Sequence, residues 1–372
     1  MQKILKYIYT IATLSGTIIG VGIFSLPYIT TKVGLGVMAL YLFILTLLVL
    51  LVNLFFSQVA LKTTDFIRLP GYAKIHLGKW GARVATLAAI LGSLGTILAY
   101  IIVGGGFLAN LLIPILGGSV FLYTFLNFII GALLIFWGIR AISKIEFWGL
   151  ALFFVSLIIV FWRGFSFFNI GNLFSQPGGF GNFFLPYGPI LFALWGASMI
   201  PEIEEMLGRD KKKIKKMVSI GTIIPAVVYL LFILLVVLIS GSSTSQEAIS
   251  GLKAILGQRI TSVMFLAGFL AVFTSFITVG LTLKKVFWYD LKMPHYFSWV
   301  LTCCLPFIFY LLGFNDFIKI IGFVGGVMLA IDGILILLMY RKIQINKTRI
   351  LVYPLILIFI TGIIYEIIYF LK

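Results

Sequence analysis

Charged residues are scarce in this chain: Asp, Glu, Lys and Arg make up only 10% of its 372 residues, whereas hydrophobic residues make up 62%. The mean hydropathy is +1.17. About a quarter of the residues of a soluble domain are charged, so this composition excludes a soluble globular class. No stretch is polar enough to form a separate soluble domain, and we expect any function to lie inside a bundle of membrane-spanning segments.

Cysteine and histidine are almost absent, with two residues of each type. Cys303 and Cys304 are adjacent within one apolar run, which suits neither a disulfide framework nor a spaced metal site. His76 and His295 lie in polar connections without partners at metal-ligand spacing. An intramembrane enzyme, the alternative from another functional class, requires a concentrated set of catalytic carboxylates, histidines or metal ligands. The chain offers no such set, so we expect neither an enzyme nor a cofactor.

Long apolar runs dominate the sequence. Each is continuous and close to the roughly 20 residues that a helix needs to cross the bilayer, whereas a β-barrel would show alternating segments of about ten residues. Eleven candidate spans lie near residues 5–28, 35–61, 83–112, 119–139, 145–162, 187–207, 217–240, 260–286, 295–313, 317–340 and 350–371. The sequence therefore predicts an all-α integral membrane protein with about eleven transmembrane helices.

The net charge of +17 has a distribution typical of membrane orientation. With the N-terminus inside, 22 of the 28 Lys and Arg residues fall in cytoplasmic connections. We therefore expect a multi-pass protein of the cytoplasmic (inner) membrane, with its N-terminus in the cytoplasm and its C-terminus outside. The basic connections need no nucleic acid to explain them. Lys3 and Lys6 precede an apolar run, but no small-residue cleavage site follows, so we expect the segment to be retained.

Two of the runs contain residues that interrupt a membrane helix. Gly16, Gly20 and Gly22 fall within seven residues of the first run, and Trp195-Gly196-Ala197-Ser198-Met199-Ile200-Pro201 interrupts the sixth. Glycine adopts backbone angles that other residues avoid, and lipid tolerates unpaired amides and carbonyls only beside protein or a wet cavity. Interrupted spans in corresponding positions of two halves predict the binding site of a secondary transporter.

A break in the first span places free main-chain groups near the bilayer midplane. The start of the outer half offers amides and a partial positive charge to a carboxylate, and the end of the inner half offers carbonyls to a cation or an ammonium group. We therefore expect a small zwitterion, an amino acid, as the substrate. The residues expected to bind it here are Thr17, Gly20, Val21 and Gly22. The alternative is that Gly16 and Gly20 only permit close helix packing, as in GxxxG pairs.

Residues of two further runs complete the expected pocket. Trp195, Gly196 and Ser198 lie at the second interruption. On the third run, Tyr100 and Gly104 face the same region, and the glycines there make room for a substrate side chain. Packing alone is the alternative explanation for these glycines.

Spans one to five and six to ten form two sets, each led by an interrupted helix. An odd number of spans gives the sets opposite orientations, which is the geometry of an inverted repeat. We predict a transporter core at residues 1–341, with repeat one at about 5–162 and repeat two at about 187–340, followed by an accessory transmembrane helix at 342–372. We see no clear residue-level identity between the two sets. We expect the protein to be a monomer in the bilayer.

Several motifs resemble a known family. Ser15-Gly16-Thr17-Ile18-Ile19-Gly20-Val21-Gly22-Ile23-Phe24-Ser25-Leu26-Pro27-Tyr28 resembles the first-helix signature of amino-acid permeases in the amino acid–polyamine–organocation superfamily. Ile200-Pro201-Glu202-Ile203, followed by Asp210-Lys211-Lys212-Lys213 and Gly221 to Tyr229, is similar to the tryptophan/tyrosine permease branch. The last third of the chain is only weakly similar. The resemblance implies the five-plus-five fold of the bacterial leucine transporter, alternating access and amino-acid import.

The resemblance also suggests a coupling ion. Ala271-Val272-Phe273-Thr274-Ser275 resembles the A-x-x-T-S element that sodium-coupled members of this fold place against the first helix. The carbonyls of Gly16, Ile19 and Ala271 and the hydroxyls of Thr274 and Ser275 would supply the oxygens that a hard cation prefers. Proton-coupled relatives often carry a lysine in span five, and 145–162 contains none. We therefore favour sodium and keep a proton-coupled permease or exchanger as the alternative, since hydroxyls in membrane helices often bond to their own backbone.

Acidic residues inside spans are costly and are therefore functional candidates. We select Glu202 and Asp332 as candidates for gating or proton transfer. A simpler explanation for Glu202 is that its charge complements a helix N-terminus. We expect Glu366 to lie at the membrane interface. We also expect residues 245–256 to form a short capped amphipathic helix on the outer face, either as a lid or lying at the interface.

Overall fold

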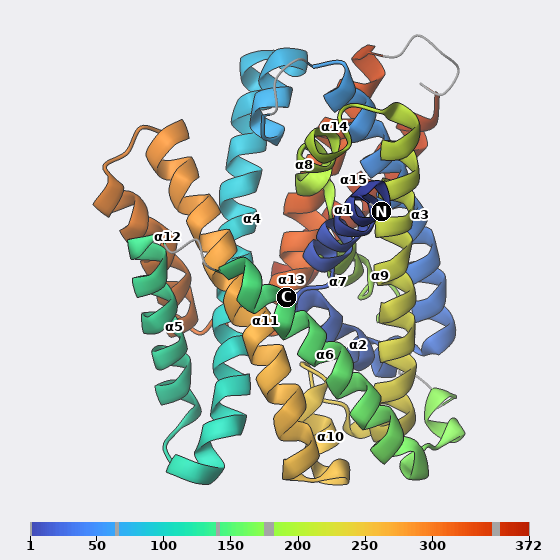
Figure 1. The fold of residues 1–372 in the computed structure, drawn as a ribbon, viewed down its shortest axis with the longest axis vertical. Coiled ribbons are helices and arrows are strands. Elements are labelled where there is room, and N and C mark those ends of the chain that lie inside the picture. The colour runs from blue at the N-terminus through green and yellow to red at the C-terminus, as the bar shows by residue number, and fades with distance from the viewer. Residues whose placement is uncertain (1, 64–66, 139–141, 175–181, 344–349, 372) are drawn as a thin grey trace.

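The computed structural model describes residues 2–63, 67–138, 142–174, 182–343 and 350–371, and these ranges form helices joined by short connections (Figure 1). The first half contains α1 (Gln2–Ile18), η1 (Val21–Ser25), α2 (Leu26–Val33), α3 (Leu35–Leu61), α4 (Leu69–Leu116), α5 (Val120–Trp137) and α6 (Ile142–Gly164). The second half contains α7 (Tyr187–Leu194), η5 (Ala197–Met199), α8 (Ile200–Leu207), α9 (Lys211–Ser240), α10 (Ile249–Leu256), α11 (Gln258–Lys285), α12 (His295–Leu311), α13 (Phe317–Phe323), η8 (Val324–Leu329), α14 (Ala330–Ile343) and α15 (Val352–Leu371).

The chain is a multi-pass membrane protein. In its described part, seven helices are long and apolar enough to cross a membrane, and an eighth span is added when the bent pair Lys6–Ile18 and Val21–Val33 is taken as one. Two further apolar helices, Ala151–Phe167 and His295–Leu311, are shorter. The prediction of an all-α membrane protein is confirmed, and the predicted span at 35–61 coincides with α3.

Local sequence signals set the helix ends. Ser119 accepts a hydrogen bond from the amide of Leu122 at the start of α5, and Gly138 ends that helix in the left-handed conformation with φ 71°. Gly78, with φ 81°, interrupts α4 and separates its first two turns from the long apolar part. A short helix within the predicted residues 245–256 is confirmed as α10: Leu252 is fully buried, and Ser245 and Glu247 accept hydrogen bonds from the amides of Gly251 and Ser250. Its place on the outer face stays a prediction.

Span ten contains a feature that the sequence did not reveal. Between α13 and α14 the chain forms the π-helical segment η8, which includes Gly325 and Gly326. Such widened turns are frequently found at functional sites. The segment packs against α7, α4 and α15.

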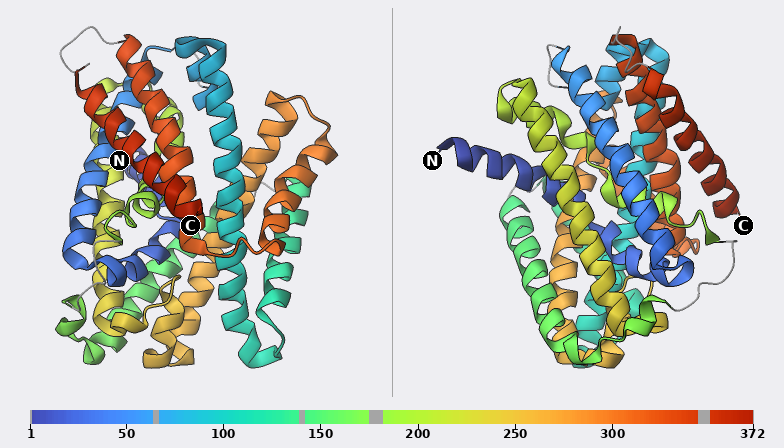
Figure 2. Two further views of the ribbon diagram at one scale, coloured as in Figure 1. Left: turned by 180° about the vertical axis from the view of Figure 1, so that it is seen from behind. Right: turned by 90° about the vertical axis from the view of Figure 1, so that its right-hand side faces the viewer.

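The arrangement places the broken helices among the long ones. Near the left edge of Figure 1, α5 and α12 lie beside each other, and α4 and α11 separate them from the remaining helices. α15 lies along α14, and α1 leans away from the bundle so that the N-terminus lies to one side of it (Figure 2). α9 packs against α1 and α2, whereas α3, α13 and η8 pack against α7, so these helices lie around the two breaks.

Candidate functional site

The first span is broken where the sequence predicted. α1 ends at Ile18, and Gly20 is extended, with φ −120° and ψ −154°, before η1 begins at Val21. The two pieces are bent by 48°. A Cβ on Gly20 would have no heavy atom within 4 Å, so open space lies directly beside the break.

The segment predicted as the sixth span is broken as well. α7 ends at Leu194, Trp195 is extended with φ −71° and ψ 118°, and α8 begins at Ile200 after a single turn of 3-10 helix. Pro201 lies in the first turn of α8, where its missing amide hydrogen has no helical partner to lose. Both predicted interruptions are therefore confirmed.

The two breaks lie side by side because glycines allow the backbones to approach. A Cβ on Gly22 would lie 2.8 Å from the Cα of Ala193 in α7, and one on Gly196 would lie 2.8 Å from side-chain atoms of Ile18. Any larger residue at either position would push the two spans apart. Gly22 and Gly196 therefore have a packing role between the two broken helices, whereas the face of Gly20 is open.

Tyr229 of α9 joins the two breaks. Its hydroxyl oxygen lies 2.6 Å from the carbonyl oxygen of Ile18 and 2.7 Å from that of Ala193. The side chain is fully buried, so these interactions are not weakened by water. The carbonyl of Ile18 also accepts a hydrogen bond from the amide of Gly20 at 2.9 Å, so the Tyr229 hydroxyl adds a link between the carbonyls at the two helix ends. Sequence reasoning missed this residue, although it closes the Gly221 to Tyr229 stretch whose motif pointed to the family.

A second contact fixes α1 to the same helix. The hydroxyl of Ser15 donates to the carbonyl of Gly221 at 3.1 Å, and a Cβ on Gly221 would meet Leu14. α9 is thus the support on which both breaks are aligned.

Aromatic rings pack behind the first break. Phe24 of η1 makes edge contacts with Phe107 at 5.1 Å, Phe153 at 5.6 Å and Phe232 at 6.1 Å between ring centroids. Tyr100 of α4 is buried and lies within electrostatic range of Tyr229. The predicted pocket residue Tyr100 therefore interacts electrostatically with the residue that joins the two breaks, and its role in binding stays a prediction.

The other predicted binding residues lie in different surroundings. Thr17 is exposed and donates to the carbonyl of Thr13 in its own helix at 2.9 Å. Ser198 is exposed, Trp195 is partly buried and Val21 is buried. A Cβ on Gly104 would meet Asn127 of α5 and Val272 of α11, so Gly104 faces a junction of helices and its neighbours there are not residues of the breaks.

The residues predicted to bind sodium lie on helices that are not packed closely together. The hydroxyl of Thr274 donates to the carbonyls of Leu270 at 2.9 Å and Ala271 at 3.1 Å in its own helix, and Ser275 is partly buried. α11 packs mainly against α4 and α6, whereas α1, which carries Gly16 and Ile19, packs mainly against α9. The sodium site stays a prediction.

The acidic candidates differ in their environments. Glu202 is exposed on α8 and lies within electrostatic range of Arg68. Asp332 is 9% exposed in α14, and its Oδ1 has no hydrogen-bond partner within the described ranges. Glu366, expected at the interface, is 2% exposed and accepts a hydrogen bond from the amide of Gly188. Its burial comes from the packing of this side of α15 against α7 and η8, and its depth in the membrane stays a prediction.

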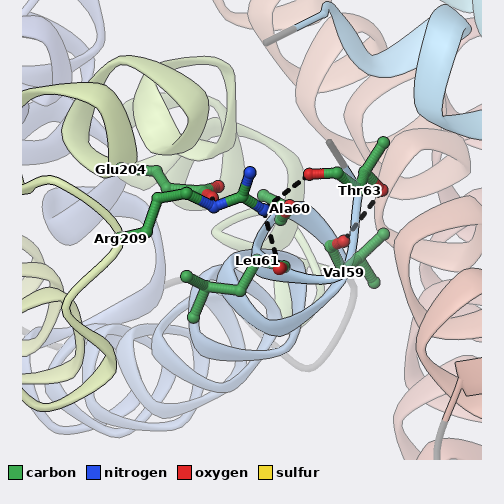
Figure 3. A network of polar contacts seen from close by, with 6 residues as sticks. All are labelled: Val59, Ala60, Leu61, Thr63, Glu204 and Arg209. Atoms are coloured by element: carbon green, nitrogen blue, oxygen red, sulfur yellow. Dashed lines mark hydrogen bonds and ion pairs between the residues drawn. The ribbon is translucent and has the colours of Figure 1, made fainter. Parts of the chain in front are cut away.

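A polar network, which the sequence did not predict, fixes α8 (Figure 3). Glu204 of α8 is buried, and its Oε1 forms an ion pair with Nε of Arg209 at 3.0 Å. Nη2 of Arg209 donates to the carbonyls of Leu61 at 2.7 Å and Thr63 at 2.6 Å. The guanidinium therefore caps the end of α3 while it holds α8.

Known proteins are similar to this chain over almost its whole length. The tyrosine-specific transport system 1 of Haemophilus influenzae (strain ATCC 51907 / DSM 11121 / KW20 / Rd) is 26% identical over 332 residues, which cover 84% of this chain and 82% of that protein. Among solved structures, Mhp1, a nucleobase-cation-symport-1 family transporter in a closed conformation with bromovinylhydantoin bound, is similar with a TM-score of 0.68 and 13% identity, covering 97% of this chain and 90% of Mhp1. MhsT in complex with L-phenylalanine is similar with a TM-score of 0.63 and 12% identity, covering 95% of this chain and 98% of MhsT.

These similarities agree with the geometry of the breaks. The two solved structures show that the chain has a fold like that of the bacterial leucine transporter. The sequence profile of the tryptophan/tyrosine permease family matches residues 3–368. The chain, a transporter and not an enzyme, belongs to the tryptophan/tyrosine permease family.

Proposed function

We propose that this protein is a secondary active transporter that imports an aromatic amino acid, tyrosine or tryptophan, across the cytoplasmic membrane by alternating access. The observation that carries the proposal is the pairing of two broken spans through Tyr229, which places main-chain dipoles beside open space at Gly20. The family, the tyrosine-specific relative and the fold of a structure holding L-phenylalanine support the choice of substrate.

The substrate is bound as a zwitterion beside the first break. Its carboxylate meets the amides that begin η1, at Val21 and Gly22, and its ammonium group meets the carbonyls that end α1. Gly20 leaves the space for the carboxylate, because a side chain there would enter the open region. Tyr100 and Trp195 flank the substrate ring, for which offset or edge contacts are favourable.

The proposed architecture has eleven spans. α7 and α8 together form the sixth span, and α6 and α12 complete the two sets of five. The transporter core comprises residues 1–341, and α15 belongs to the segment 342–372 outside the repeat. The N-terminus is cytoplasmic and the C-terminus is outside, as the distribution of basic residues favours.

Alternating access moves the half-helices against the remaining bundle. The lean of α1 away from the other helices fits an arrangement that is open on the inner side (Figure 2). Return of α1 toward α11 would assemble the carbonyls of Gly16, Ile19 and Ala271 with the hydroxyls of Thr274 and Ser275 around sodium. A proton-coupled permease or exchanger is the alternative, favoured by the buried carboxylates of Asp332 and Glu366.

Uptake by proteoliposomes tests the function. Purified protein is reconstituted with labelled tyrosine, tryptophan, phenylalanine or leucine outside, under an inward sodium gradient, an inward proton gradient or neither. We expect tyrosine or tryptophan to accumulate above the level of protein-free vesicles. Dependence on sodium supports the leading coupling, and uptake in sodium-free vesicles driven by protons supports the alternative. Absence of uptake of every aromatic amino acid would falsify the assignment.

Gly20→Leu is expected to abolish this uptake, a loss of about a hundredfold or more, because the side chain fills the space for the carboxylate. Gly36→Leu is the matched control, since a Cβ on Gly36 also has open space around it but lies on α3, away from the breaks. Tyrosine binding and uptake are measured in both variants. Normal uptake by the Gly20→Leu protein would show that the substrate carboxylate does not bind at this position.

Replacing Thr274 and Ser275 together by Ala is expected to raise the sodium concentration for half-maximal uptake by about tenfold or more, because two ligands are removed. Thr278→Ala is the control, since the hydroxyl of Thr278 bonds to the carbonyl of Thr274 in the same helix. The measurement is tyrosine uptake against sodium concentration. An unchanged sodium dependence would exclude these hydroxyls as ion ligands.

A further inference from the structure

The last helix, α15, carries a carboxylate into the interior of the protein. Glu366 is 2% exposed, and its Oε1 accepts a hydrogen bond from the amide of Gly188 at 3.1 Å. Gly188 lies in the first turn of α7, where amides lack partners in their own helix and the helix dipole is positive. Glu366 therefore binds the positive end of one piece of a broken span.

Three glycines make room for this carboxylate. A Cβ on Gly188 would collide with Oε1, one on Gly322 would lie 3.0 Å from Oε2, and one on Gly326 would lie 3.0 Å from Cδ. These glycines come from α7, α13 and η8. One helical turn before Glu366, Gly362 packs against the ring of Tyr187. The site is thus built from four elements around a single side chain.

No cation within ion-pair distance compensates Glu366 in the part of the chain that the structure describes, where the ion pairs join Glu204 to Arg209 and Asp210 to Lys213. η8 supplies no ionisable residue. The titratable groups that face this region come from four places: Tyr187 from α7, Tyr41 from α3, Tyr365 and Tyr369 from α15, and Asp316 and Lys319 from the start of α13.

One of these phenols has a buried hydroxyl group without a hydrogen bond among the described residues. Tyr187 is 4% exposed, and its hydroxyl has no hydrogen-bond partner among the described residues. A buried carboxylate without a cation is stable in its ionised form only while nearby donors and dipoles compensate its charge. The principal compensation in the structure comes from the start of α7, so the charge of Glu366 depends on the position of that helix.

We propose that Glu366 is a proton-binding latch for α7. The ionised carboxylate holds the amide of Gly188 and the positive end of the helix. When a proton from the outer solution binds a carboxylate oxygen, an O–H bond forms, the charge is lost and the attraction to α7 weakens. α7 then moves away from α15 while the carboxyl group stays in its apolar surroundings, so its proton affinity is higher without the Gly188 amide than with it. Return of α7 restores the hydrogen bond and releases the proton to the outer water. By linkage, movement of α7 and proton binding favour each other.

The latch deepens the proposed function and rests on it, because α7 is one of the pieces that alternating access moves. It also gives α15, which lies outside the proposed repeat, a role in controlling the outer side of the transporter. A purely structural anchor would show no response to pH, which distinguishes the two roles.

Distance measurements between spin labels test the latch. Cys303 and Cys304 are replaced by Ser, and labels are attached to cysteines at position 184, just before α7, and at position 312, just after α12. Phe184 and Leu312 are 41% and 68% exposed, so both sites accept a label. The full chain in lipid nanodiscs is measured without substrate, from about pH 8 to about pH 5, a range in which carboxyl groups in apolar sites titrate.

In the parent protein we expect the ratio of the released to the held arrangement to rise by about tenfold or more as the pH falls, the effect of losing one charge-assisted hydrogen bond. Glu366→Gln, a neutral isostere, should adopt the released distances at every pH, and Glu366→Asp should keep a pH response. Glu247→Gln is the matched control, because Glu247 also accepts a backbone amide hydrogen, from Ser250 at 3.2 Å, but lies far from α7 in the chain.

Distances that do not change with pH in the parent protein would overturn the latch, as would a pH response that persists in Glu366→Gln. The labels report on α7 without any substrate. Failure of tyrosine uptake in proteoliposomes would therefore overturn the proposed function while a pH-dependent distance still supports the latch.

Discussion

Two buried carboxylates hold the two pieces of the sixth span, and they do so differently. Glu204 on α8 is paired with Arg209 at 3.0 Å, and the same guanidinium caps the end of α3. Glu366 binds the start of α7 through one amide at 3.1 Å, without a cation within ion-pair distance among the described residues. α8 is therefore fixed by a permanent charge, whereas α7 is held by a charge that depends on a proton.

This difference shows how one broken helix can have a fixed end and a releasable end. An arginine stays protonated at any physiological pH, so its charge is always present to favour the ionised form of Glu204. A carboxylate compensated mainly by a helix end gains a proton when that helix moves away. The protein thus places its pH-sensitive contact on one piece of the span only.

Other basic residues near the proposed cytoplasmic side act in the same way as Arg209. Lys284 is buried, and its Nζ donates to the carbonyls of Ile135 and Phe136 at the end of α5, both at 2.9 Å. Nζ of Lys62 donates to the carbonyl of Ile343 at the end of α14, at 2.7 Å. Helix C-termini carry partial negative charge, so cations there stabilise the fold as well as favour one orientation in the membrane.

The largest effect is expected when the permanent charge of Arg209 is removed. Arg209→Met leaves Glu204 buried without its partner and the end of α3 uncapped, which we expect to cost on the order of 3 kcal/mol and to abolish uptake. Thermal unfolding in detergent and tyrosine uptake measure both effects. Adding Glu204→Gln should restore part of the stability, because the unpaired charge is removed. If the double variant is no more stable than the single one, the ion pair is not the source of the effect.

A smaller effect is expected where the two spans meet. Tyr229→Phe removes the hydroxyl shared by the carbonyls of Ile18 and Ala193, and we expect uptake to fall by about tenfold to a hundredfold because the breaks lose their alignment. Tyr123→Phe is the matched control, since the hydroxyl of that buried residue donates to a single carbonyl, of Gly117, in the connection between α4 and α5. Equal losses in the two variants would show that Tyr229 only contributes stability.

The sequence predicted the long apolar helices and the two interruptions because both signals are local. A run such as 35–61 is apolar throughout and long enough to cross the bilayer, and it forms α3 over the same residues. Gly20 and Gly196 mark the breaks because membrane helices rarely place several glycines so close together without a structural reason.

The contacts that hold the site could not be predicted in this way. Tyr229 is 211 residues from its partner Ile18, and Glu366 is 178 residues from Gly188, so the partners are apparent only once the helices are packed. Glu366 was assigned to the interface because it lies near the end of the last apolar run. The glycines at 322, 325 and 326 are the signal that could have indicated a close approach by another chain segment.

The smallest effect is expected at the exposed neighbour of the buried ion pair. Asp210 accepts hydrogen bonds from the amides of Lys212 and Lys213 at the start of α9, and its carboxylate lies 2.7 Å from Nζ of Lys213. The hydrogen bond from the Lys213 side chain, followed by those from the backbone amides, lowers the pKa of Asp210 below its ordinary value. The pKa of Asp210 is lower in the folded state than in the unfolded state. Asp210 therefore stabilises the fold at pH values above its ordinary, unfolded-state pKa, and this stabilisation is lost as the pH falls through the folded-state pKa.

Asp210→Asn should therefore reduce thermal stability only slightly at neutral pH, since Asn caps helices about as well as Asp and exposed ion pairs contribute little. The difference between Asp210→Asn and the parent protein should disappear in acid, where both side chains are neutral. Uptake of tyrosine should be unchanged at neutral pH. If Asp210→Asn lost as much stability as Arg209→Met, the exposed ion pair would contribute as much to stability as the pair formed by Glu204. The contrast between the two ion pairs in this connection would then fail.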